Sequence, residues 1–88
     1  MDVMEELEKY LLNEVAVETA LESLAPDDDL LMQGIIDSMG IVQLTEFMEK
    51  RFGIRVMDDE MVPENFQNLR ALADFVERKA RVNILIRG

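Results

Sequence analysis

The chain has 88 residues, enough for one small domain with one modest core, and 49% of them are apolar, which favours folding over disorder. The absence of cysteine and histidine excludes disulfides, the common zinc sites and the usual nucleophile–base pairs, so we expect neither a bound metal nor an enzyme. A net charge of −10 argues against nucleic acid, and without a long apolar run or a basic–apolar leader we expect a cytoplasmic protein that does not insert into membranes.

Residues 2–15 are predicted to form the first helix. Apolar side chains fall on one arc at the helical repeat, and acidic residues near the start suit the positive end of the helix dipole. The phase fails at Glu18, so the helix should end near Glu14 to Val17, with a further turn within Glu18 to Leu24 as an alternative. The arc consists of Val3, Met4, Leu7, Tyr10, Leu11 and Val15.

Ala25 to Asp37 is predicted to be a long first loop. Pro26 and the acidic run that follows it break a helix, and Gly34 permits a turn with positive φ. The acidic run does not match a calcium-binding EF-hand loop. Four apolar residues should pin the loop onto the core, namely Leu30, Leu31, Ile35 and Ile36.

Ser38 to Phe52 is predicted to be the second helix, and Gly53 suits the position just after its end. A short third helix is expected within 58–66, near Pro63. Asn68 can cap a last helix over 69–81, leaving residues 82–88 as an unassigned tail. The core-facing arc of the second helix consists of Ile41, Leu44, Phe47, Met48 and Phe52, and that of the last helix of Leu69, Leu72, Phe75, Val76 and Ala80.

The stretch Gly34-Ile35-Ile36-Asp37-Ser38-Met39-Gly40, followed by an amphipathic helix that ends at Gly53, resembles the modification site of acyl and peptidyl carrier proteins. The resemblance covers roughly Leu7 to Val76. It implies an all-α four-helix bundle of acyl-carrier type over residues 1–88, with three main helices, a short third helix and a long first loop. A serine at this position is otherwise most simply read as an N-cap.

The same resemblance implies that Ser38 is modified with 4′-phosphopantetheine, whose thiol carries cargo as a thioester. Asp37 would order the first turn or help to present Ser38, and Gly40 would keep the approach to Ser38 open. The implied partners are a phosphopantetheinyl transferase that uses coenzyme A, a cargo-loading ligase or adenylating enzyme, and downstream acyl-processing enzymes. The carrier itself is expected to be a free-standing monomer.

Two apolar residues on the second helix, Met39 and Val42, lie off the core arc and beside Ser38. Polar and acidic residues border them, namely Gln43, Glu46 and Glu49. The family resemblance assigns this face to partner recognition, so these five residues are predicted to form a docking patch.

The second helix differs from that of fatty-acid carriers at several positions, which limits the kind of carrier that this chain resembles. Gly40 and Gln43 stand where those carriers often have acids, Glu46 stands where an apolar residue is common, and Lys50 and Arg51 dilute the acidic helix. These differences favour a specialised carrier with an acyl or aminoacyl cargo. Two alternatives stay open: a D-alanyl carrier of cell-wall biosynthesis, which has a similar Asp-Ser helix, and an unmodified acidic helical interaction module.

Overall fold

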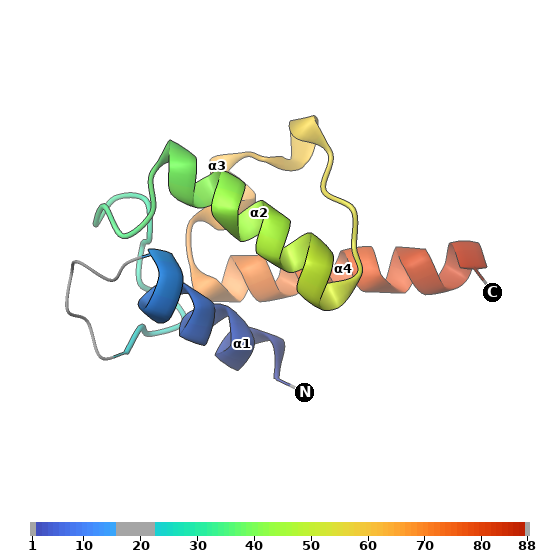
Figure 1. The fold of residues 1–88 in the computed structure, drawn as a ribbon, viewed down its shortest axis with the longest axis horizontal. Helices are drawn as coiled ribbons and strands as arrows, with labels where there is room; N and C mark the ends of the chain where they lie inside the picture. Colours follow the sequence, from blue (N-terminus) through green and yellow to red (C-terminus); the bar gives the residue numbers. More distant parts are fainter. Residues whose placement is uncertain (1, 16–22, 88) are drawn as a thin grey trace.

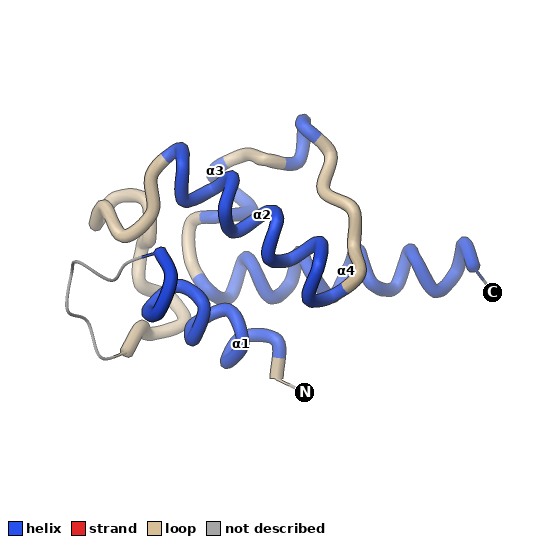
Figure 2. The backbone as a smooth tube through the Cα atoms, viewed as in Figure 1, coloured by secondary structure: helices blue, strands red, loops and turns tan. Residues whose placement is uncertain are grey.

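The computed structural model describes residues 2–15 and 23–87, and within these ranges the regular structure is entirely helical (Figure 2). The chain forms α1 (Val3–Tyr10), a π-helical turn η1 (Leu11–Val15), α2 (Ser38–Phe52), a 3₁₀ turn η3 (Asp58–Glu60), α3 (Pro63–Phe66) and α4 (Leu69–Arg87) (Figure 1). This confirms the predicted all-α fold with a short third helix. None of the described helices has the apolar length that crossing a bilayer requires.

The core forms where α1, α2, α3 and α4 meet, and it combines residues of the predicted apolar arcs with Leu30 of the first loop and Phe66 of α3. Burying one such side chain stabilises the fold by about 1.5–3 kcal/mol relative to leaving it in water. Aromatic contacts extend the core: the rings of Phe66 and Phe75 lie 6.4 Å apart. The side chains that are essentially inaccessible to solvent are Leu7, Leu11, Leu30, Leu44, Met48, Phe66, Leu69, Leu72 and Val76.

The long first loop is held against the core, as predicted. Leu30, Ile35 and Ile36 are buried, and the Leu30 carbonyl accepts hydrogen bonds from the N–H groups of both Ile35 (2.9 Å) and Ile36 (3.1 Å). The Leu30 N–H donates in turn to the Gln67 carbonyl (2.7 Å). Gly34 has a φ of +70°, which glycine adopts without the steric cost that other residues meet. These contacts therefore hold the loop in one conformation up to the start of α2.

The first helix differs from the prediction in its winding. Asp2 is its N-cap, because its Oδ1 accepts the N–H groups of Met4 (3.0 Å) and Glu5 (3.3 Å). Beyond Tyr10 the chain widens into the π-helical turn η1, whereas the sequence predicted a single helix over 2–15. The alternative turn within residues 18–24 falls mostly outside the described residues.

The predicted third helix is divided in two. The 3₁₀ turn η3 and helix α3 are separate elements within 58–66, and Pro63 begins α3 because its missing N–H costs nothing at the first helical position. Asn68 caps α4 as predicted, with its Oδ1 accepting the Ala71 N–H (2.7 Å).

The predicted end of the last helix at residue 81 is wrong, because residues 82–87, which the sequence left unassigned, are also helical. Helix α4 continues to Arg87, and its last turns extend beyond the other helices (Figure 1). The basic residues at 78, 79 and 81 suggested a helix end because cations favour the C-terminal turn. Extending an existing helix needs no new nucleus, so the backbone continues past those charges.

One ion pair joins η3 to α4 and should respond to pH. Lys79 Nζ donates to Glu60 Oε1 (2.8 Å), and the Met57 N–H donates to the same oxygen (2.9 Å). The hydrogen bond from Lys79 lowers the pKa of Glu60 below its ordinary 4.5, burial opposes this shift, and the Met57 N–H adds to it.

Glu60→Gln should therefore lose about 1 kcal/mol of unfolding free energy at pH 7. A lowered pKa means that the charged glutamate stabilises the fold above pH 4.5, and that this advantage disappears as the pH falls through the lowered value. Urea unfolding of both proteins between pH 7 and pH 3 measures the difference. If the wild-type protein stayed more stable than Glu60→Gln by the same amount at every pH in this range, the ion pair between Glu60 and Lys79 would not be the source of the difference.

Candidate functional site

Helix α2 begins at the residue predicted to be modified, but Asp37 supplies the cap. Asp37 has an extended backbone, and its Oδ1 accepts the Gly40 N–H (2.9 Å). The limits Ser38–Phe52 are those predicted, and Gly53 closes the helix with a φ of +67°. The interpretation of Ser38 as a plain N-cap is therefore wrong, because Asp37 already fills that role.

The Ser38 side chain is exposed at the first residue of α2. Within the described residues, its hydroxyl takes part in no hydrogen bond. The first N–H groups of a helix have no partners inside the helix, and together with the helix dipole they favour a negative charge close by. An accessible hydroxyl at this position suits the attachment of a phosphodiester.

Gly40 serves a different purpose from the one the sequence suggested. The expectation that it keeps the approach to Ser38 open is wrong, because Gly40 is buried and faces the interior. A Cβ at this position would lie 3.1 Å from Ile36 Cβ and 3.3 Å from Val15 Cγ1. The glycine is needed for the close approach of the first loop and η1 to α2.

Four of the five predicted docking residues are exposed on α2. The side chains of Met39 and Val42 keep 65% and 44% of their surface accessible, high values for large apolar residues. Gln43 and Glu46 are exposed beside them. The structure thus brings these four residues onto one accessible face that begins next to Ser38.

The fifth predicted docking residue, Glu49, is partly buried and makes an internal contact. Its Oε2 accepts the N–H of Val56 (2.9 Å), in the segment between α2 and η3. This carboxylate therefore holds the chain that follows α2 against the helix. No sequence pattern indicates this contact, because the two residues are separated by the turn at Gly53.

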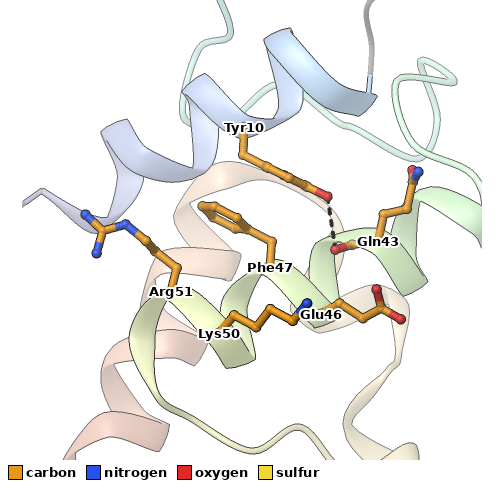
Figure 3. Close-up of a pocket in the computed structure, with 6 residues that line it drawn as sticks. All are labelled: Tyr10, Gln43, Glu46, Phe47, Lys50 and Arg51. Atoms are coloured by element: carbon orange, nitrogen blue, oxygen red, sulfur yellow. Dashed lines mark hydrogen bonds between the residues drawn. The ribbon is translucent and has the colours of Figure 1, made fainter.

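A shallow groove between α1 and α2 lies beside the exposed face of α2 (Figure 3). The Tyr10 and Phe47 rings stack across it with centroids 4.1 Å apart, and the Tyr10 hydroxyl donates to the Gln43 carbonyl (3.2 Å). Burial raises the pKa of Tyr10, and the charges of Glu14 and Glu46 raise it further, so the phenol keeps the proton that it donates. The groove encloses about 390 Å³ and is lined by Tyr10, Gln43, Glu46, Phe47, Lys50 and Arg51.

The sequence did not predict this groove. It placed Tyr10 and Phe47 on core arcs, and both are partly buried rather than enclosed. At the end of the groove, Arg51 forms an ion pair with Glu6 (2.9 Å), which ties α2 to α1 a second time. Helical periodicity identifies apolar faces, but it does not show which of them remain open between two helices.

A capped helix that presents an exposed serine, at the end of a pinned loop in a small helical bundle, is the arrangement expected of a carrier domain. Comparison with known proteins agrees: residues 3–76 match the family model described as a phosphopantetheine attachment site. The chain belongs to this phosphopantetheine-binding family of carrier proteins.

A particular relative and a solved structure extend the comparison. A D-alanyl carrier protein from Streptococcus suis (strain 98HAH33) is 38% identical over 66 residues, which span 75% of this chain and 80% of the relative. A chain in a crystal structure described as that of an FAD-dependent dehydrogenase is 28% identical, with a TM-score of 0.71. That match covers 80% of this chain and 97% of the other, and it supports the same fold.

Family membership establishes that the chain carries its cargo through covalently attached 4′-phosphopantetheine. It also implies that the chain interacts with a phosphopantetheinyl transferase and with enzymes that load or process the cargo. These findings argue against the alternative of an unmodified interaction module.

Proposed function

We propose that the protein is a free-standing carrier whose 4′-phosphopantetheine is attached to Ser38, and that it is a substrate of its partner enzymes rather than a catalyst. The observation that supports this best is the exposed Ser38 hydroxyl, which is free of hydrogen bonds to the described residues at the first position of α2. Asp37 fixes the turn on which Ser38 sits without occupying its hydroxyl.

In the attachment step, the Ser38 oxygen attacks the β-phosphate of coenzyme A. A bond forms between this oxygen and phosphorus, and the pyrophosphate P–O bond breaks, so that the nucleotide bisphosphate leaves. The hydroxyl proton passes to a base of the transferase. The product is an anion at a helix N-terminus, where the dipole favours it.

For the cargo, we propose an amino acid held as a thioester, with D-alanine as the first candidate. The 38% identity to a D-alanyl carrier supports this choice. The mixed charge of α2, where Lys50 and Arg51 accompany Glu46, only separates this helix from the more acidic one of fatty-acid carriers. The loading partner would then be an adenylating ligase. We further propose that the carrier works as a monomer in the cytoplasm, where coenzyme A is available.

An intact-mass measurement tests the proposal. The protein is incubated with coenzyme A and a broad-specificity phosphopantetheinyl transferase, and it should gain the mass of one arm, which peptide mapping then places on Ser38. Loading of the modified protein with D-alanine or other amino acids, by an adenylating ligase and ATP, identifies the cargo. A correctly folded protein that gains no mass would refute the proposal.

The exposed apolar pair beside Ser38 supports a docking prediction. Met39→Ala should slow arm transfer roughly five- to tenfold, because it removes one methylene, the sulfur and the terminal methyl, which a partner would cover in part at about 0.8 kcal/mol per carbon group. Glu46→Gln should have a smaller effect that fades with salt, since exposed charge pairs contribute only about 0.2–1 kcal/mol and are screened. Transferase rates at two salt concentrations measure both.

Circular dichroism provides the folding control for these two variants. Both side chains are exposed, so neither substitution should unfold the bundle. A folded Met39→Ala protein that reacts at the wild-type rate would mean that the transferase docks elsewhere.

A further inference from the structure

We propose that Gly40 and Val15 are positioning residues for attachment of the arm. The missing side chain at position 40 lets η1 close on the first turn of α2, and this contact fixes the position of the backbone that carries Ser38. The inference rests on the proposed function, in which Ser38 accepts the arm.

A Cβ at Gly40, in the first turn of α2, would be crowded by its neighbours. An added Cβ would lie 3.1 Å from Ile36 Cβ, 3.3 Å from Val15 Cγ1 and 3.5 Å from Asp37 Oδ1. The first two distances are shorter than ordinary van der Waals contact, so a neighbour would have to move. Ile36 is poorly able to do so, because it is buried and its N–H is bonded to the Leu30 carbonyl (3.1 Å).

The contact between Val15 and Gly40 depends on the π-helical turn η1. A π turn takes in more residues than an α turn, so Val15 falls at a different angle from the one that a continued α-helix would give it. Nearby, the Tyr10 hydroxyl holds the Gln43 carbonyl, so α1 and α2 cannot easily separate. The start of α2 is thus held by the Asp37 cap, the buried loop and η1.

A methyl group at position 40 would push the start of α2 away from Ile36 and Val15 and strain the Asp37 cap. Ser38 lies two residues before Gly40, so its hydroxyl would be displaced from the position that the transferase meets. Gly40→Ala should therefore reduce kcat for arm transfer roughly three- to tenfold, because its neighbours must give by a few tenths of an ångström, less than the displacement of about 1 Å that costs a positioned reaction about a hundredfold. KM should stay nearly unchanged, since Met39 and Val42 remain exposed.

A double-mutant cycle tests the inference. Val15→Ala alone should lower kcat roughly two- to threefold, because it removes the contact that helps to hold the start of α2. The double variant Gly40→Ala/Val15→Ala should have a higher kcat than Gly40→Ala, because the smaller side chain gives α2 room to move toward η1. A purely structural role predicts that Gly40→Ala lowers the melting temperature but leaves kcat of the folded protein unchanged. Thermal unfolding of each variant checks that the folded state is retained.

A folded Gly40→Ala protein with wild-type kcat, or a double variant with no recovery, would overturn the inference. If Gly40→Ala does not fold, Val15→Ile adds a methyl group to the same contact from η1 and should also lower kcat. A wild-type kcat in Val15→Ile would then overturn it. Peptide mapping of the arm separates this outcome from the proposed function: an arm on another residue refutes the assignment of Ser38 itself.

Discussion

Ser38→Ala should gain no mass when it is incubated with transferase and coenzyme A, whereas the wild-type protein gains one full arm. The substitution removes the oxygen that would form the phosphodiester. Ser23 is the only other serine in the chain, which makes Ser23→Ala the matched control, and that variant should be modified completely. Intact mass spectrometry of the three proteins decides the result.

The same variant should remain as stable as the wild type. Ser38 is exposed and makes no hydrogen bond within the described residues, so its unfolding free energy should change by no more than about 0.5 kcal/mol. Loss of the cap in Asp37→Ala should cost about 1 kcal/mol, because the Gly40 N–H loses its acceptor. A folded Ser38→Ala protein that still acquires the complete arm would place the modification on a different residue.

The largest expected effect on stability comes from Leu44→Ala. Leu44 is completely buried in the middle of α2, and truncating a buried leucine costs about 2–5 kcal/mol through lost burial and the cavity left behind. Domains of this length have a total stability of roughly 4–13 kcal/mol, so the variant should unfold at much lower urea concentration or be partly unfolded. The midpoint of urea unfolding measures the change.

Val42→Ala is the matched control on the same helix. Val42 lies two residues before Leu44 and faces solvent, with 44% of its surface accessible. Its truncation should change the unfolding free energy by no more than about 0.5 kcal/mol. Equal losses in the two variants would show that the assignment of the buried and exposed faces of α2 is mistaken.

Local features of the sequence were sufficient to predict the element that carries the candidate site. Asp37 and Gly53 mark the two ends of α2, and the 3.6-residue repeat separates the buried Leu44 and Met48 from the exposed Met39. Each of these signals acts within one or two helical turns, so it can be read along the chain. The pattern around Ser38 then indicated the carrier family, and the family match agrees.

The tertiary structure alone decided which distant groups these residues meet. Gly40 is required because Val15 and Ile36 approach it, and Glu49 is engaged because the chain turns back at Gly53 to present the Val56 N–H. The sequence also placed the end of α4 too early, since charge marks a preferred helix end but does not impose one. Caps and periodicity depend on neighbours in the chain, whereas packing at Gly40 depends on the path of the whole backbone, which the sequence pattern does not reveal.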